Sequence, residues 1–300
     1  MRGFWIITLV ILLLPMCSTR KKFDGRFFEM GVRQGALDNP EINEASGLAS
    51  SVVNSGMFWT HNDSGDKARI FLIDGEARNR AVVWLKDFSN RDWEDISVGP
   101  GPEEGKSYVY VGEIGDNASR HEYKYLYRME EPVIAGASSV VDTTLSKVDS
   151  IKFTLEGGPR DTEAVIVDPL TRDIYIFSKN EKKSIRVFRL PYPQSVTEVI
   201  QAEYVMSLSI VKVCAADISP DGKEILIKNY THVYYWSRKG NESIPEILEQ
   251  DPISLPYTTE PQGEAITFDR DGKGYYTLSE ENNHKKPYLL FYQRKMTNSN

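Results

Sequence analysis

Three features of the sequence predict an all-β fold, a β-propeller of five four-stranded blades. A segment of three short strands occurs five times, with first strands that begin at residues 46, 94, 163, 216 and 264. These starts are 48, 69, 53 and 48 residues apart, close to the roughly 40–50 residues of a propeller blade. Hairpin turns such as Ser219-Pro220-Asp221-Gly222 separate the first two strands. Six blades, one of them degenerate, are the alternative; a β-sandwich would explain the strands but not their spacing.

Each copy has its strands in the same order. The second strands are expected at residues 57–63, 108–113, 174–180, 225–229 and 275–280, and the third at 70–73, 125–127, 185–188, 233–236 and 289–292. Fourth strands are expected at Ala81–Phe88, Val148–Leu155, Ala202–Ile210 and Asp251–Tyr257, and an insert, Ala135–Ser146, explains the longest spacing. The last copy ends before a fourth strand. We therefore expect the N-terminal segment Phe27–Val32 to pair beside Leu289–Tyr292, which closes the ring and removes its open sheet edges.

The first 17 residues resemble the signal peptide of a bacterial lipoprotein. Arg2 precedes the apolar run Phe4–Met16, which is too short for a comfortable transmembrane helix. The run leads into Cys17 and resembles a lipobox, although Met16 stands where that pattern has Gly, Ala or Ser. We expect a signal peptide at 1–17, a lipidated Cys17, a tether at 18–25 and a single propeller domain at 26–300. The protein would then be exported and anchored to the membrane at the cell envelope, with the outer membrane favoured; ordinary secretion or an uncleaved anchor is the alternative.

Composition excludes several classes of protein. The chain has 36 lysine and arginine residues and 43 aspartate and glutamate residues, without a basic block, so a nucleic-acid partner is not expected. With Cys17 lipidated, Cys214 has no partner, which excludes disulfides, including one to a partner protein. Cys214 is expected to be a small buried residue. The sequence contains no nucleophile elbow, Walker loop, dinucleotide fingerprint or zinc-type histidine pair.

Three of the five first strands begin with a glutamate, at Glu94, Glu163 and Glu264, and the other two begin at Ser46 and Ala216. Equivalent positions in a ring of blades face one axis, and carboxylates that converge there repel one another unless a cation neutralises them. Ca²⁺ prefers oxygen ligands of this kind. The sequence therefore predicts a Ca²⁺ site made by Glu94, Glu163, Glu264 and Ser46. The alternative is that each glutamate pairs with Lys or Arg, or caps backbone amides.

The loops between second and third strands return to the end of the ring where the first strands begin. Two of them are polar strings, His61-Asn62-Asp63-Ser64-Gly65-Asp66 and Gly112-Glu113-Ile114-Gly115-Asp116-Asn117, and all four histidines fall in or beside such loops. Acids and bases around a metal suit a small anionic or phosphorylated ligand; a solvated charged rim is the alternative. The predicted catalytic residues are His61, Asp63 and Arg120, and the predicted ligand-binding residues are Asn62, Asp66, Glu113, Asp116, Asn117, Arg160, Lys179 and Lys228.

The glutamates at the strand starts resemble those of TolB-like and gluconolactonase-like bacterial propellers, in which metals lie in the channel. The set Ser46, Glu94, Glu163 and Glu264 is also similar to that of the calcium-activated nucleotidases (apyrases), five-bladed propellers with an axial Ca²⁺ held by Glu and Ser; Ala216 departs from that pattern. The resemblance implies an envelope-anchored propeller lipoprotein with a metal-binding polar site. Such a protein would either hydrolyse a small anionic or phosphorylated substrate or act as a non-catalytic scaffold that binds a ligand or a protein.

Overall fold

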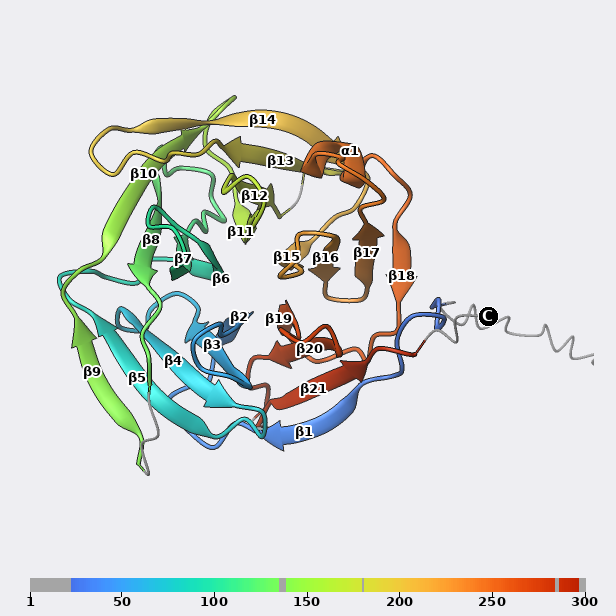
Figure 1. Cartoon of the computed structure of the whole chain (residues 1–300). Helices are drawn as coiled ribbons and strands as arrows, with labels where there is room; N and C mark the ends of the chain where they lie inside the picture. Colours follow the sequence, from blue (N-terminus) through green and yellow to red (C-terminus); the bar gives the residue numbers. More distant parts are fainter. Residues whose placement is uncertain (1–22, 135–138, 180, 284–285, 297–300) are drawn as a thin grey trace, which may run out of the picture.

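The sheets of this protein surround a central axis as in a propeller (Figure 1). The computed structural model describes residues 23–134, 139–179, 181–283 and 286–296, so the predicted signal peptide and Cys17 lie outside the described residues. Apart from the short helix α1 (Ile244–Leu248), the regular elements in the described ranges are strands. The predicted all-β, propeller-like fold is confirmed. No helix in these ranges is long and apolar enough to span a membrane.

The strands of the described residues form four sheets. The first contains β2 (Ala45–Ser50), β3 (Met57–Asn62), β4 (Arg69–Asp74), β5 (Asn79–Leu85) and β9 (Val141–Leu145). The second runs in the order β6 (Trp93–Pro100), β7 (Ser107–Glu113), β8 (Lys124–Glu130), β10 (Asp149–Leu155), β14 (Ile200–Leu208), β13 (Ile185–Leu190), β12 (Ile174–Ser178) and β11 (Thr162–Val167). The third contains β15 (Val213–Ile218), β16 (Glu224–Asn229), β17 (Val233–Ser237) and β18 (Ile253–Leu255). The fourth contains β19 (Gly263–Phe268), β20 (Gly274–Ser279), β21 (Tyr288–Gln293) and β1 (Val32–Ala36).

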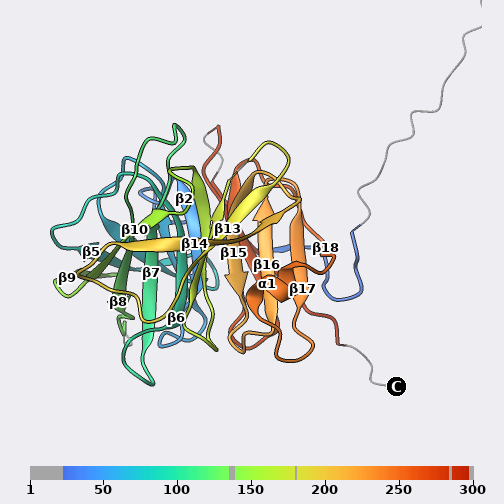
Figure 2. The same ribbon diagram turned by 90° about the horizontal axis from the view of Figure 1, so that it is seen from above.

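The innermost strands are β2, β6, β11, β15 and β19, and each contacts the next around the axis, with β19 beside β2 (Figure 1). The eight-stranded sheet has an innermost strand at both ends, because its two halves are joined only by their outer strands. That junction is a parallel pairing of β10 with β14, from Phe153↔Ile200 to Leu155↔Ala202. Figure 2 shows β14 running across the side of the molecule, crosswise to strands such as β7.

The N-terminal segment lies beside the last strand, as the ring closure requires, but its strand is not where the sequence suggested. Strand β1 begins at Val32, which pairs with Phe291 in antiparallel register. The predicted segment Phe27–Val32 overlaps β1 only at Val32, and its earlier residues contribute one isolated bridge, between Phe28 and Arg294. Gly35 lies too close to the backbone of Glu76 for any side chain, which explains a glycine within this edge strand.

The insert Ala135–Ser146 contains a strand that the sequence did not predict. Strand β9 adds to the outside of the first sheet by parallel pairing with β5, from Ala81↔Val141 to Leu85↔Leu145. Its residues are half-buried or exposed, so it lacks the apolar pattern by which the other strands could be recognised.

The apolar core lies between neighbouring sheets. One cluster joins β2–β5 to β6–β8 and includes Trp59 and Val109; another joins β19–β21 to β2–β5 and includes Leu48 and Leu278. Helix α1 extends the cluster between β11–β14 and β15–β17. Because both faces of a sheet are covered, the innermost strands are buried along almost their whole length, and they appear in the sequence as continuous apolar runs.

Buried polar side chains link the innermost strands to one another. The carboxylate of Asp95 on β6 accepts a hydrogen bond from the backbone N–H of Val165 on β11, at 2.9 Å. The carboxylate of Asp217 on β15 accepts from the backbone N–H of Phe268 at 2.7 Å and from the hydroxyl of Thr267 at 2.9 Å, both on β19. Burial raises the pKa of Asp217 to about 6. The ring is therefore held by directional bonds as well as by apolar packing.

We expect Phe28→Ala to lower the free energy of unfolding by about 3–5 kcal/mol. The Phe28 ring is fully buried, lies 5.0 Å from the ring centre of Tyr275 and 6.1 Å from that of Tyr235, and so ties the N-terminal segment to two sheets. Urea unfolding of the full chain measures the loss. Phe27→Ala is the matched control, because Phe27 is only partly buried and should cost clearly less. Equal losses in the two variants would contradict this role of the N-terminal segment.

Candidate functional site

Each innermost strand begins with a shift in register against the strand beside it. The residues at the shifts are Ser46, Glu94, Glu163, Cys214 and Glu264. A bulge of this kind leaves one residue out of the ladder and re-aims its side chain. Equivalent bulges around the ring therefore present equivalent residues at one end of it, and this explains why glutamates recur at these positions.

In the fourth copy the residue at the register shift is not the predicted Ala216. That prediction follows the match of Asp217-Ile218-Ser219 to Asp95-Ile96-Ser97. In the structure Asp95 lies opposite Gly112, immediately after the register shift. Asp217 lies opposite Leu226, two residues further along its strand, so the equivalent residue is Cys214. Strand pairing, and not local sequence identity, decides which side chain the bulge presents.

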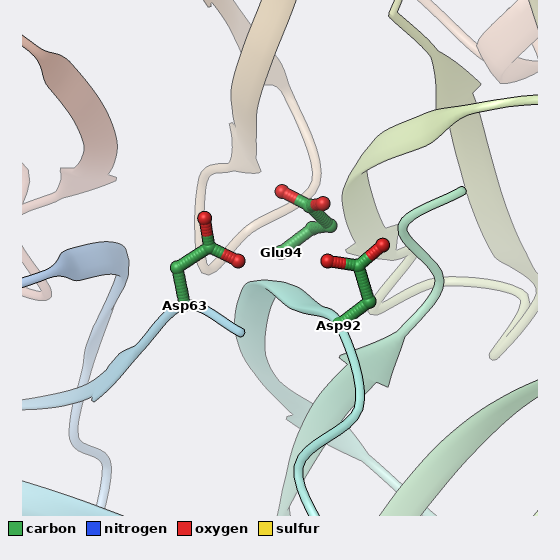
Figure 3. A group of neighbouring side chains, drawn as sticks. All are labelled: Asp63, Asp92 and Glu94. Carbon is green, nitrogen blue, oxygen red and sulfur yellow. The ribbon is translucent and has the colours of Figure 1, made fainter. Parts of the chain in front are cut away.

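Carboxylates from the bulges and the adjoining loops gather at this end of the ring, which we call the acidic mouth. In the described part of the chain they form three linked groups, in each of which one oxygen of every member lies within 4.8 Å of the others. Figure 3 shows the carboxylates of Asp63, Asp92 and Glu94 turned toward one another. The groups are Asp63–Asp92–Glu94, Glu94–Asp161–Glu163 and Asp63–Glu264–Glu280.

The predicted set of ligands is divided by this arrangement. Glu94 and Glu163 share a group, whereas Glu264 belongs to another and is linked to Glu94 only through Asp63. The hydroxyl of Ser46 donates a hydrogen bond to the backbone oxygen of Glu94 at 2.8 Å, so it links two innermost strands. Asp63, predicted as catalytic, belongs to two of the acidic groups and joins them.

Burial and mutual repulsion raise the pKa values of these carboxyls. Burial raises the pKa of Glu163 to about 8, although Lys179 opposes the shift. Burial, with the charges of Glu264 and Asp63, raises that of Glu280 to about 8. The pKa of Asp63 is raised to about 6 by burial and then by Glu264, and that of Glu94 is raised well above its ordinary value by burial and by Glu163. The acidic mouth therefore favours either protons or an added cation.

Sequence reasoning missed Asp92 and Asp161. Each lies two residues before one of the predicted glutamates, immediately before the start of its innermost strand. The signal was present as a repeated Arg-Asp-x-Glu pattern at residues 91–94 and 160–163. The arginines have similar roles: Arg91 lies 3.1 Å from Glu113, the last residue of β7, and Arg160 lies 2.7 Å from Glu181, which follows β12.

The segment Gly112–Asn117 packs against the residues of the acidic mouth. Glu113 accepts hydrogen bonds from the backbone N–H of Asp92 at 2.9 Å and from the indole N–H of Trp93 at 3.1 Å. A side chain at Gly115 would collide with the carboxylates of Glu94 and Asp92, so only glycine allows the backbone to approach them. Glu113 is thus occupied by the chain itself, which does not support its predicted role in ligand binding.

Asp116 closes the turn that follows. Its carboxylate accepts from the backbone N–H groups of Arg120 at 2.8 Å and His121 at 2.9 Å. Asn117 and Arg120 are exposed, and neither belongs to the acidic groups. The predicted catalytic role of Arg120 therefore gains no support from the geometry, and Asp116 shapes the loop.

In the His61–Asp66 string only Asp63 joins the acidic mouth. His61 is completely buried, with Nδ1 2.8 Å from the backbone oxygen of Asn62, and burial lowers its pKa to about 4. It therefore does not face solvent as a catalytic base would. Asn62 donates to the carboxylate of Asp66 at 2.9 Å, and Asp66 pairs with Arg69 at 2.9 Å. These residues hold the loop that carries Asp63.

The predicted cationic residues have different surroundings. The ammonium of Lys179 lies 2.8 Å from Glu163, at the acidic mouth, and Lys179 also lines a pocket of about 410 Å³ with Asn117, Arg160 and Asp161. Lys228, predicted to bind a ligand, is completely buried and donates to the backbone oxygen of Gly263, so its ammonium is already used by the chain itself.

Cys214 is a small buried residue, as the sequence predicted. Burial raises the pKa of its thiol to about 12. It packs as a small apolar residue at the position where other units have a glutamate. His284, one of the four loop histidines, lies outside the described residues.

Comparison with known proteins identifies no family for this chain. No protein-family model matches it, and no curated protein does. Among solved structures, it is similar to a chain in the structure described as "Crystal Structure of Mitotic Checkpoint Complex", with a TM-score of 0.39 and 13% sequence identity. That match covers 82% of this chain and 62% of the other. The fold assignment therefore rests on the strand pairing described above.

Proposed function

We propose that this protein is an envelope-anchored lipoprotein whose five-bladed propeller binds a divalent cation, Ca²⁺, at the acidic mouth. The observation that carries the proposal is the linked set of buried and half-buried carboxylates there. Among the described residues, a single ion pair, between Lys179 and Glu163, reaches this set. One lysine leaves most of the negative charge without compensation, and a bound cation would supply it.

The nature of the ligands favours a hard cation. Every member of the acidic groups offers carboxylate oxygen, and none is His or Cys, which suits Ca²⁺ better than zinc or copper. We assign the ion to Asp63, Asp92 and Glu94, because no lysine or arginine pairs with these three in the described structure, whereas Lys179 pairs with Glu163 in the adjoining group. Gly115 allows the backbone to come close to the same carboxylates.

The count of five blades is part of the proposal. It treats the eight-stranded sheet as two blades joined by β10 and β14. Two observations support it: the same register shift begins each innermost strand, and an apolar cluster separates each four-stranded unit from the next. Strand β1 then supplies the outer strand of the last blade.

A metal-dependent hydrolase is the second candidate. It is favoured by the pocket of about 410 Å³ beside the acidic mouth, where Arg160 and Lys179 face Asp161, and by carboxyl groups with raised pKa values, which are typical of functional sites. A non-catalytic scaffold requires only the ion. Hydrolysis of phosphate esters or lactones that stops when a chelator is added would distinguish the enzyme from the scaffold.

We expect Ca²⁺ to raise the melting temperature of the full chain and Asp63→Asn to abolish that rise. A ligand that binds the folded state alone adds about 2.7 kcal/mol at a concentration one hundred times Kd. Melting curves with EDTA and with Ca²⁺ measure the effect, and Glu94→Gln should behave like Asp63→Asn. Glu198→Gln is the control, since it removes one charge from an exposed loop residue and should leave the rise intact. A full rise in Asp63→Asn, or none in the wild type, would refute the site.

Without divalent cations we expect stability to fall as the pH rises from about 6.5 to 8. Glu163 and Glu280 have folded pKa values of about 8, against an ordinary value of 4.5. In this window the folded state therefore binds more protons than the unfolded state, and the free energy of unfolding decreases with pH. His61, lowered to about 4, acts oppositely below this window, and Lys124, lowered to about 8 by burial, acts oppositely above it.

Thermal melting at several pH values in EDTA measures this slope. Saturating Ca²⁺ should reduce the slope, because the positive ion beside Glu163 and Glu280 favours their charged forms, and Glu163→Gln should reduce it without calcium. Glu198→Gln again serves as the control and should keep the wild-type slope. Stability that rises with pH across the window would show that the carboxyls of the acidic mouth are not protonated in the folded state.

For the anchor, we expect Cys17→Ser to move the protein from the membrane fraction to the soluble fraction. Lipid on Cys17 would be the attachment, and a hydroxyl cannot accept it by the same route. Fractionation followed by immunoblotting gives the result, with Cys214→Ser as the matched control that should stay in the membrane. Retention of Cys17→Ser in the membrane would instead indicate an uncleaved apolar anchor.

A further inference from the structure

The innermost strands converge on a second pocket, at the end of the ring opposite the acidic mouth. This pocket has a volume of about 230 Å³ and is lined by the last residues of β6, β11 and β15 and by the turns after β2 and β19. Glu94 and Pro100 stand near the two ends of β6. A strand rises about 3.3 Å per residue, so the two sites lie roughly 20 Å apart. The second pocket is therefore separate from the proposed cation site and does not depend on it.

Arg270, in the turn after β19, lines this pocket and an adjoining hollow of about 700 Å³. Among the described residues its guanidinium has no hydrogen-bond or ion-pair partner; the charges of Asp217 and Glu131 act on it only through space. The carboxylate of Asp217 is bonded to β19, and that of Glu131 accepts from the hydroxyl of Ser51 and the indole N–H of Trp59. The Arg270 side chain is half-buried, and its guanidinium donors are available to a ligand that accepts from them.

The pocket also has an apolar wall, and its side chains Ser107 and Lys106 are respectively enclosed and already paired. The hydroxyl oxygen of Ser107 is buried without a hydrogen-bond partner in the described structure. The nearby ammonium of Lys106 is already paired with Glu103 and Glu130, at 2.8 and 2.9 Å. Aliphatic and proline side chains make up much of the remaining wall: Val52, Val98, Pro100, Val167, Pro169, Ile218 and Pro220.

We propose that this second pocket binds a small organic monocarboxylate with an apolar body. The planar guanidinium of Arg270 matches a carboxylate with two parallel hydrogen bonds, and the apolar body packs against the aliphatic wall. A monoanion is expected in preference to a dianion such as phosphate, because the carboxylates of Asp217 and Glu131, which act on Arg270 through space, repel two negative charges more strongly than one. A volume of about 230 Å³ is below the roughly 300–1,000 Å³ of drug-sized sites, so the ligand is small.

Calorimetric titration of the full-length protein with benzoate and with 4-methylpentanoate tests the proposal. We expect saturable binding of at least one of them, with benzamide and inorganic phosphate bound at least about tenfold more weakly. Arg270→Gln should weaken binding roughly ten- to a hundredfold. Lys183→Gln is the matched control, because Lys183 is an exposed lysine outside the pocket, and its binding should equal that of the wild type.

A second variant keeps the test valid if Arg270→Gln does not fold. Val52 is 44% exposed in its turn, so Val52→Trp should fold and fill the pocket while leaving Arg270 in place; it should also abolish binding. The proposal is overturned if Arg270→Gln or Val52→Trp binds as the wild type does. It is also overturned if benzamide or phosphate binds as tightly as the carboxylates, or if neither carboxylate shows saturable binding at roughly 10 mM.

Discussion

The register shift at the start of each innermost strand is the constraint on which the acidic mouth depends. Because the shift occurs at equivalent positions, Glu94, Glu163 and Glu264 emerge at one end of the ring although they are far apart in the sequence. Repulsion between their carboxylates would push the strands apart if other interactions did not hold the ring together. It is held by apolar clusters between the sheets and by Asp95 and Asp217, which bond to the backbone or hydroxyl groups of neighbouring innermost strands.

Bringing these carboxylates together destabilises the folded state when they are charged. The raised pKa values of Glu163, Glu280 and Asp63 indicate this destabilisation. The polar loop strings make the arrangement possible. Glu113 fixes the backbone that carries Asp92, and Gly115 allows the loop to approach the carboxylates. Most of the conspicuous polar residues in these strings are therefore structural, and they hold in place the few acids that could bind an ion.

The two ends of the ring differ in charge. At the acidic mouth, carboxylates outnumber the single lysine that contacts them among the described residues. At the other end, Arg270 has no partner within the described chain while neighbouring carboxylates are used by other donors. The innermost strands connect the two ends, so one scaffold offers a site suited to a cation and another suited to an anion.

The sequence by itself determined what depends on local pattern: the short strands, their spacing, the glutamates at three strand starts and the small buried Cys214. Tertiary structure decided what depends on pairing between distant segments. The pairing of β15 with β16 places Cys214, and not Ala216, at the bulge. Parallel pairing with β5 makes a strand of residues 141–145, which lack an apolar pattern. Packing buried His61 and Lys228, which look like exposed polar residues in the sequence. It also added Asp92, Asp161 and Glu280 to the site, because the distance between two carboxylates is set by how strands and loops meet in space and not by their separation along the chain.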